Sequence, residues 1–205
     1  MLPLNASHFT PKNPKDQCLG KLTDAKIQFL EQSTTFTLRE KIELLMVLTH
    51  TSWVTDLDVR HDRLDHNKAY VDALTRLELP WKTEHYVKRD GTSVYWMQVG
   101  ANEAILDYLE QNRERLSVLE AGVFYGYPPT AVLGCVNILE SKYKPVGEKS
   151  VAEFYLAGVF SADFIDQEVS YAVQMWSRLA KMSPKIVAEA ESYRQERLKE
   201  LESRK

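Results

Sequence analysis

The stretch WKTEHYVKRDGTSVYWMQVG, residues 81–100, differs from the rest of the chain because its residue types alternate and are rich in Thr, Tyr, Val and Trp. Such a pattern is typical of β-strands. At its centre, Asp90-Gly91 favours a type I′ turn, which needs positive φ at both central residues. With this pair as a two-residue loop, Tyr86 faces Tyr95. A lone hairpin is marginally stable in water, so we expect one of its faces to pack on helices.

Amphipathic patterns predict helices on both sides of this hairpin. In the segment TLREKIELLMVLTHTS, Thr37 and Glu40 form a capping box, which is a helix-start signal. After Gly100 the pattern is helical to the end of the chain, with breaks at prolines and glycines. Residues 51–67 are charged and aperiodic, and we expect a loop with short turns there.

These patterns predict a mainly α (α+β) fold, in which a single helical domain carries one two-stranded β-hairpin. Residues 1–21 hold three of the eight prolines and predict an extended N-terminal arm. Residues 22–183 form the helical domain, with the hairpin at about 81–99. Residues 184–205 predict a highly charged C-terminal helix, which is solvated or contacts another copy in a homo-oligomer.

Composition and charge restrict the class of protein. A chain of 205 residues is long enough for one good core. The net charge of −3 and the pI of about 6.0 supply no global field that would attract nucleic acid or an anionic membrane. No stretch reaches the roughly 18 to 20 apolar residues of a transmembrane helix, and the N-terminus lacks the pattern of a secretory signal. We therefore expect a soluble, cytoplasmic protein with no membrane partner.

The stretch AGVFYGYPPTAVLGCVNI, residues 121–138, predicts two helices joined by a tight turn. Gly122, Gly126 and Val132 have the spacing of a DNA-binding helix-turn-helix, which this stretch resembles. The positions of the second helix that we expect to face solvent carry no cation, and phosphate contacts dominate DNA affinity. Those positions are Pro129, Thr130, Leu133, Gly134 and Asn137. The sequence therefore disfavours nucleic acid as a partner, and packing of two core helices is the simpler interpretation.

The turn itself is a candidate binding surface. Rigid aromatic and apolar residues contact a partner at low entropic cost. The turn supplies four of them and the hairpin two, and we propose all six as binding residues: Tyr125, Tyr127, Pro128, Pro129, Tyr86 and Trp96. The alternative is that the tyrosines of the turn pack in the core or under the N-terminal arm.

A second candidate site is the stretch HTSWVTDLDVRHDRLDH, residues 50–66, which is rich in histidine and aspartate. Imidazole and carboxylate groups bind zinc, manganese or iron. The candidate ligands of such a divalent metal are His50, His61, Asp62 and His66. The alternative is a polar loop in which neighbouring arginines form salt bridges with the aspartates.

No glycine-rich phosphate loop, Gly-x-Ser-x-Gly or Cys-x-x-Cys motif occurs in the chain. The sequence therefore favours a non-catalytic intracellular protein that binds a protein or a small molecule through the aromatic residues. The first alternative is a metal-dependent hydrolase that uses the His/Asp stretch, and the second is a helix-turn-helix DNA-binding regulator.

Overall fold

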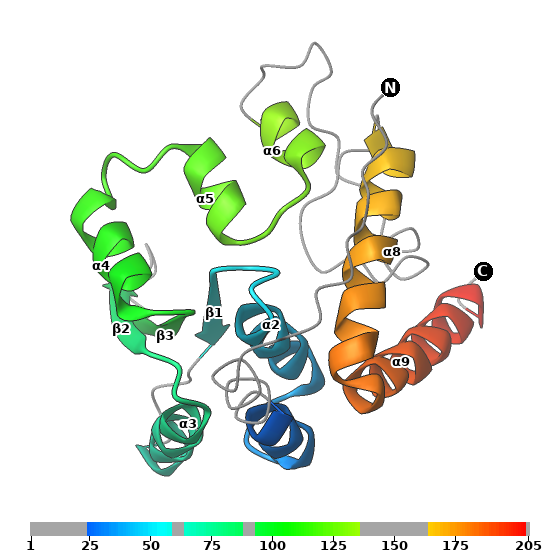
Figure 1. The fold of residues 1–205 in the computed structure, drawn as a ribbon, viewed down its shortest axis with the longest axis horizontal. Coiled ribbons are helices and arrows are strands. Elements are labelled where there is room, and N and C mark those ends of the chain that lie inside the picture. The colour runs from blue at the N-terminus through cyan, green and yellow to red at the C-terminus, as the bar shows by residue number, and fades with distance from the viewer. Residues whose placement is uncertain (1–23, 59–63, 88–92, 136–163, 204–205) are drawn as a thin grey trace, which may run out of the picture.

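The computed structural model describes residues 24–58, 64–87, 93–135 and 164–203 (Figure 1). It begins with a helix at residues 24–32. The elements that follow are α2 (Leu38–Leu48), β1 (Val54–Asp58), α3 (Leu64–Leu77), β2 (Trp81–Val87), β3 (Ser93–Gly100), α4 (Glu103–Asn112), α5 (Val118–Phe124), α6 (Pro129–Cys135), α8 (Ile165–Met182) and α9 (Pro184–Ser203). The fold is mainly α with a small antiparallel sheet, which confirms the predicted class. The arm predicted for residues 1–21 lies outside the described residues.

The sheet has three strands in the order β1-β3-β2, one more than the hairpin alone. The loop predicted for residues 51–67 is therefore wrong in two places, because β1 and the start of α3 fall within it. Both faces of β1 are covered: Leu57 packs into the main core, and Val54 packs into a second cluster on the opposite face. Because the two apolar residues face opposite sides and Thr55 and Asp56 lie between them, the strand lacks the alternation of apolar and polar residues by which a strand is predicted.

The hairpin is confirmed, but its predicted register is wrong by one residue. Tyr86 pairs with Val94 and not with Tyr95. The observed register sets Trp81 opposite Val99, which belongs to the main core, and Trp81 is partly buried and packs against that core. A shift of one residue moves a strand's side chains to the other face of the sheet, so the packing of one face fixes the register.

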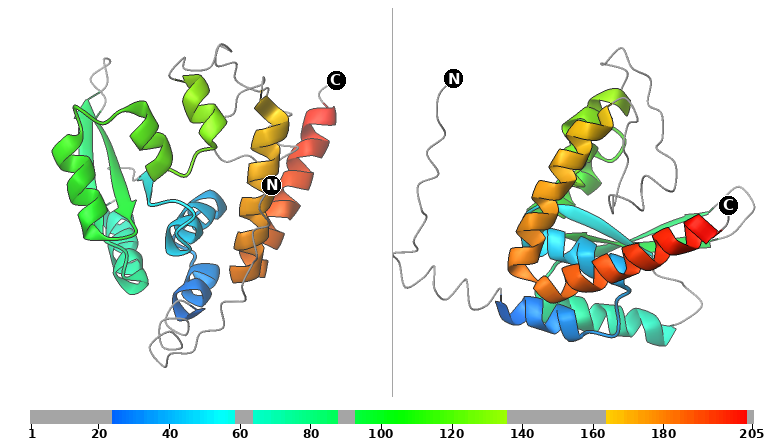
Figure 2. Two further views of the ribbon diagram at one scale, coloured as in Figure 1. Left: turned by 45° about the horizontal axis from the view of Figure 1, so that its top comes forward. Right: turned by 90° about the vertical axis from the view of Figure 1, so that its right-hand side faces the viewer.

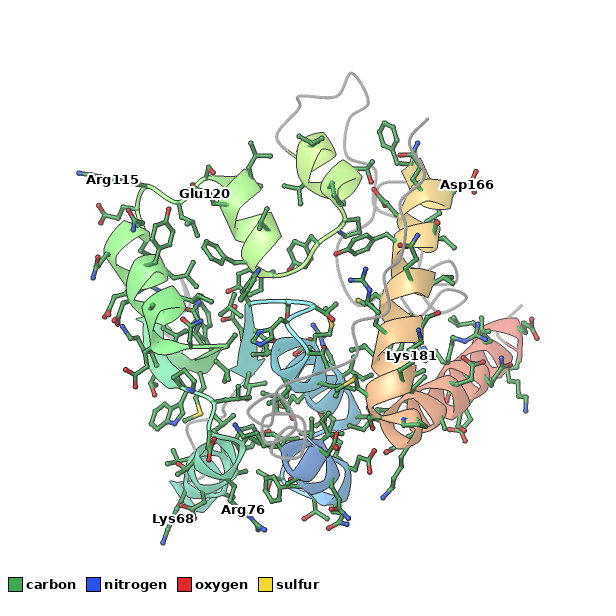
Figure 3. The ribbon with its side chains drawn as sticks, viewed as in Figure 1. Lys68, Arg76, Arg115, Glu120, Asp166 and Lys181 are labelled. Atoms are coloured by element: carbon green, nitrogen blue, oxygen red, sulfur yellow. The ribbon has the colours of Figure 1, made fainter. Side chains whose placement is uncertain are left out.

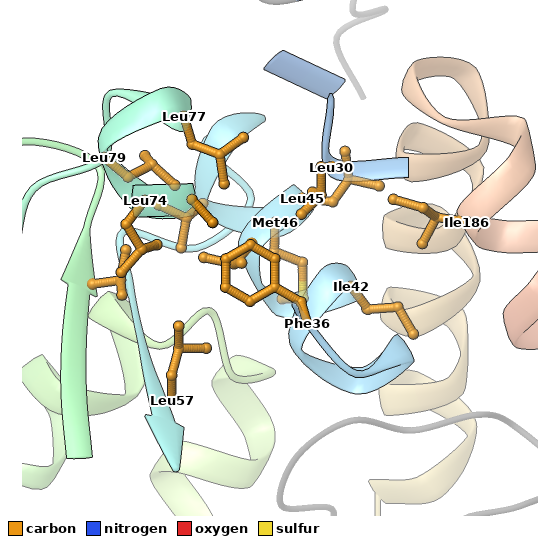
Figure 4. Close-up of a cluster of buried hydrophobic side chains, with 14 of the residues drawn as sticks. Leu30, Phe36, Ile42, Leu45, Met46, Leu57, Leu74, Leu77, Leu79 and Ile186 are labelled. Carbon is orange, nitrogen blue, oxygen red and sulfur yellow. The ribbon is translucent and has the colours of Figure 1, made fainter. Parts of the chain in front are cut away.

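The sheet lies between two layers of helices. One face carries Leu57, Met97 and Val99, which pack with α2 and α3 in the main core (Figure 4). The other face carries Val54, which packs with Leu106 and Leu109 of α4 and with the end of α5. Figure 1 shows α3 and α5 on opposite sides of β1. Because α4 and α5 pack on this second face, the turn between α5 and α6 lies against the sheet.

The C-terminal helices close the main core from a third side. Ile186 and Ala190 of α9 are buried with Leu179 of α8, and α9 contacts α2. Ser183 starts α9: its Oγ accepts a hydrogen bond from the Ile186 N–H at 3.2 Å and donates one to Glu31 Oε1 at 2.6 Å. From this junction α8 and α9 diverge (Figure 2). Within the described residues, no helix combines the length and the apolar character needed to cross a membrane.

Candidate functional site

The turn between α5 and α6, which we call the corner and define as Tyr125–Pro128, is held by close backbone packing. Gly126 has φ of +70°, and a Cβ there would lie 2.8 Å from the carbonyl oxygen of Thr51. The Trp53 N–H donates to the Phe124 carbonyl at 2.8 Å. A side chain at this position would be strained and would clash with Thr51, so the observed turn requires glycine here. The corner is therefore fixed against the segment that links α2 to β1.

Helix α5 begins with a capping box that orients the helix entering the corner. The Glu120 N–H donates to Ser117 Oγ at 3.2 Å, and the Ser117 N–H donates to a carboxylate oxygen of Glu120 at 2.9 Å. Tyr108 of α4 donates its hydroxyl proton to the same carboxylate at 2.9 Å, on the α4 side of α5 (Figure 3). These hydrogen bonds lower the pKa of Glu120, with the Ser117 side chain as the largest cause. The ionised carboxylate thus joins α4 to α5.

The two tyrosines of the corner stack on each other and are both half-buried. Their ring centroids lie 5.9 Å apart, and the ring planes differ by 19°. Tyr125 donates its hydroxyl proton to Asp56 Oδ2 at 2.7 Å and accepts a hydrogen bond from Gln98 Nε2 at 3.3 Å. The corner is therefore anchored to the neighbouring strands β1 and β3 through one side chain.

Burial and the carboxylates near the two tyrosines raise the pKa values of their hydroxyl groups. Burial is the largest cause of the raised pKa of Tyr125, and the Asp56 carboxylate is the next. The pKa of Tyr127 is raised by burial, then by Asp56 and by Glu43, while Arg39 lowers it. The carboxylates therefore influence Tyr127 more strongly than the guanidinium does.

Glu43 and Arg39 of α2 form an ion pair at the edge of this site. Arg39 Nε donates to Glu43 Oε1 at 2.9 Å, and the Thr55 hydroxyl donates to Glu43 Oε2 at 3.3 Å. Burial raises the pKa of the Glu43 carboxyl, and the hydrogen bond and charge of Arg39 oppose that effect. The Arg39 side chain itself is 84% exposed. The ion pair thus lies at the edge of the site, with Arg39 in solvent and Glu43 largely buried.

The Tyr127 hydroxyl differs from that of Tyr125. No hydrogen bond joins it to any residue in the part of the chain that the structure describes, although its ring is half-buried. A polar group that is partly removed from water and has no protein partner can form a hydrogen bond with a ligand.

The structure separates the six predicted binding residues. Tyr125 and Tyr127 lie at the centre of the site, whereas Pro128 is buried and Pro129 is exposed in the first turn of α6. Trp96 is half-buried on β3, two residues from Gln98 and therefore on the same face of the sheet. Tyr86 belongs to β2, and its side chain lies outside the described part of the structure.

The outline of a helix-turn-helix is present, but α6 does not expose all the positions we expected. Gly134 is buried, and Thr130 is half-buried and donates to Glu168 Oε1 of α8 at 2.9 Å. Glu168 is fully buried. Helix α8 therefore covers part of the face that a recognition helix would present to DNA, because the side chains that reach base edges must be exposed. The predicted position Asn137 lies outside the described residues.

The predicted metal ligands remain a prediction. His50 is exposed, has φ of +54°, and lies 5.4 Å from the ring of Trp53. His61 and Asp62 lie outside the described residues, as does the side chain of His66. Among the side chains that the structure does describe, no three or more His, Cys, Asp or Glu are grouped so as to hold a metal ion.

Sequence reasoning missed the polar residues that the fold adds to the two tyrosines. Asp56 and Glu43 come from β1 and α2, and Gln98 comes from β3. No short motif connects them, because they lie on three separate elements. Recognition of the Val54–Asp58 strand was the one signal that could have placed Asp56 beside Gln98, its pairing partner.

The fold and the site define a mainly α protein with a three-stranded sheet and an acidic, aromatic site at a helix corner. No family model matches the chain, and no curated protein or solved structure matches it either.

Proposed function

We propose that this is a non-catalytic cytoplasmic binding protein that contacts its partner through the corner. The observation that carries the proposal is the contrast between the two stacked tyrosines. Tyr125 uses its hydroxyl to hold the corner on the sheet, whereas the Tyr127 hydroxyl has no hydrogen-bond partner among the described residues. The first tyrosine supports the second, and the second meets the ligand.

The rigidity of the corner favours this role. A contact residue that is already fixed loses little conformational entropy when a partner binds. The ring stack, the positive φ of Gly126 and the hydrogen bonds of Tyr125 all restrict Tyr127 before any partner arrives. Tyrosine also contributes both apolar area and a polar group, which is why it is common at binding hot spots. We infer that a protein is the partner, with a small molecule as the alternative ligand.

The test compares partner capture by four variants that change one hydroxyl or one ring each. Tyr127→Phe removes only the hydroxyl, which has no partner among the described residues, and we expect capture of the specific partner to fall by about five- to tenfold. The melting temperature should not change, because no hydrogen bond to a described residue is lost. Tyr193→Ala is the matched control, since Tyr193 is an exposed tyrosine on α9.

Tyr125→Phe completes the set because it removes a structural hydroxyl. It should lower the melting temperature and reduce capture less than Tyr127→Phe does. If Tyr127→Phe and Tyr127→Ala both retain the full set of captured proteins, the corner is not the contact surface and the proposal fails.

A further inference from the structure

We propose that the open edge of strand β2 binds an extended segment of a partner protein, which adds a fourth, antiparallel strand to the sheet and alternates apolar with basic residues. This surface is formed by other elements than the corner, so the inference goes beyond the proposed function. It follows from the direction of the backbone groups of β2 and from the acidic face of α4 beside that strand. In Figure 1, β2 and α4 lie together at the side of the molecule away from α8 and α9.

The register of the sheet shows which backbone groups of β2 point away from β3. The Gly100 N–H donates to the Pro80 carbonyl at 3.0 Å, so these two residues form a hydrogen-bonded pair. Along an antiparallel ladder, hydrogen-bonded and non-hydrogen-bonded pairs alternate. The residues of β2 whose N–H and C=O groups point outward are therefore Trp81, Thr83, His85 and Val87. None of them is a proline, so each offers one donor and one acceptor to a further strand.

The edge formed by β2 is open in the part of the chain that the structure describes. The order β1-β3-β2 gives β2 only one neighbouring strand. No hydrogen bond joins the outward backbone groups of Trp81 or Thr83 to any described residue. Thr83 is exposed, although Met97, its partner across the ladder, is only 3% exposed. The cover of the main core therefore ends between β3 and this part of β2.

Strand β2 lacks the features that usually protect an edge strand. It pairs with β3 through seven consecutive residues without a bulge, and none of them is a proline. Natural proteins interrupt exposed edges with prolines, bulges or charges, so an intact edge of this length favours strand addition. The other edge strand, β1, is shorter and is flanked by its neighbours, because Glu43 of α2 bonds Thr55 and Tyr125 of the corner bonds Asp56.

The charges beside β2 favour basic residues in the added strand. Lys82 Nζ donates to Asp107 Oδ1 at 2.7 Å and to Glu110 of α4, so one ammonium group faces two carboxylates. Glu103 lies on the same stripe of α4, one turn before Asp107, and is exposed. Glu103 forms no ion pair with a described residue. Three carboxylates thus outnumber one ammonium group, and they lie on the side toward which alternate side chains of an added strand would point.

The remaining side chains of the added strand would meet a different surface. Trp81, on the other face of β2, is partly buried and packs against the main core, so an apolar neighbour would extend that core. A second copy of this chain is a poor occupant of the edge. Antiparallel pairing of two β2 strands would bring both α4 helices, each with its acidic stripe, to the same face of the sheet, where their charges would repel each other.

The test is amide hydrogen exchange of the full chain, labelled with nitrogen-15 and followed by NMR. In the protein alone, we expect the amides of Trp81, Thr83, His85 and Val87 to exchange faster than those of Lys82, Glu84 and Tyr86, which bond to β3. The probe is the blocked peptide Val-Lys-Val-Lys-Val-Lys-Val. At saturation, the peptide should slow exchange of the outward amides by at least about tenfold. Outward amides that are already protected without the peptide would overturn the proposal, because the edge would then be covered.

Two N-methylated peptides test for strand addition itself. In the antiparallel arrangement, the valine N–H groups of the probe point toward β2 and the lysine N–H groups point away. Methylation of the valine nitrogens should weaken binding by at least about tenfold, whereas methylation of the lysine nitrogens should change it by less than about threefold. Equal losses for the two peptides would show that the probe does not add a strand, and the proposal would fail.

Thr83→Pro tests the same edge from the protein side. The Thr83 N–H points outward, so proline removes no bond to β3, and proline is tolerated at such positions of edge strands. Peptide affinity should fall by at least about tenfold while the exchange of the amides bonded to β3 stays slow. Full affinity in this variant would overturn the proposal.

The charge of the added strand is tested separately. A peptide with glutamate in place of lysine should bind at least about fivefold more weakly than the probe, and Asp107→Asn should weaken binding of the probe about threefold. Glu189→Gln is the control, because Glu189 is an exposed carboxylate on α9 and the change in net charge is the same. Equal binding of the lysine and glutamate peptides would overturn the assignment of a basic partner. Protection of the outward amides that rises with protein concentration alone would show that a second copy occupies the edge, and the assignment to another protein would be wrong.

Discussion

A single hydroxyl group, that of Tyr125, connects three segments that are far apart in the sequence. It donates to Asp56 of β1, accepts from Gln98 of β3, and belongs to the turn after α5. Burial and the Asp56 carboxylate raise its pKa, because both disfavour the phenolate. Tyr125 therefore both stabilises the corner and has a pKa that depends on the charges of the site.

This raised pKa predicts a loss of stability in alkaline solution. A tyrosine in the unfolded chain ionises near pH 10, whereas the folded protein keeps the Tyr125 proton to higher pH. Between these two pKa values the folded state binds more protons, so the free energy of unfolding falls as pH rises above about 10. Below pH 10 the neutral Tyr125 hydroxyl makes its full contribution to the free energy of unfolding.

Tyr125→Phe should reveal this contribution. At pH 7 we expect a loss of about 1 kcal/mol from the two hydrogen bonds, and the difference from the unchanged protein should shrink above pH 10. Urea denaturation between pH 7 and 11.5 measures both effects. Tyr193→Phe, at an exposed tyrosine of α9, should follow the unchanged protein throughout. A difference that stays constant up to pH 11.5 would contradict the assignment.

At the scale of elements, the corner depends on how closely α5 approaches α6. Gly122 is buried, and a Cβ at that position would lie 2.3 Å from Val132 Cγ2. Two helices can come this close only where one of them has no side chain. The glycine that resembles a helix-turn-helix residue in the sequence is therefore a packing residue in the fold.

Gly122→Ala should force the two helices apart and lower the free energy of unfolding by about 1–3 kcal/mol. The cost should be at least about 1 kcal/mol smaller when Val132→Ala is also present, because the clashing methyl groups are gone. Gly134→Ala is the control: no atom of the described residues lies within 4 Å of its added Cβ, so stability should stay the same or rise by up to about 1 kcal/mol. Urea denaturation of the four variants tests the coupling, and additive losses would show that Val132 is not the obstacle.

At the scale of the whole molecule, the main core joins elements from both ends of the described chain. Ile186 of α9 is 1% exposed and lies in the same cluster as Leu30 and Leu179. The charged C-terminal helix is thus attached by a short apolar face at its beginning, while its later residues are mostly exposed. The helix contributes to the core of the domain as well as to its surface.

Ile186→Ala should lower the free energy of unfolding by about 2–5 kcal/mol, because it leaves a cavity between α2, α8 and α9. Tyr193→Ala on the same helix should change it by no more than about 0.5 kcal/mol, since that side chain is 56% exposed. Thermal or urea unfolding followed by circular dichroism measures both. Equal effects at the two positions would mean that α9 does not dock as the structure shows.

The sequence by itself determined the class of the fold, the hairpin and the glycine turn of the corner. Each depends on local signals: helical periodicity, the alternation in residues 81–100, and the need for glycine at Gly126. Only the tertiary structure decided the third strand, the hairpin register and the polar residues of the site. These features arise from contacts between segments that are distant in the chain. Burial of one face of the sheet determines the register, and a half-buried tyrosine hydroxyl needs a hydrogen-bond acceptor from another element.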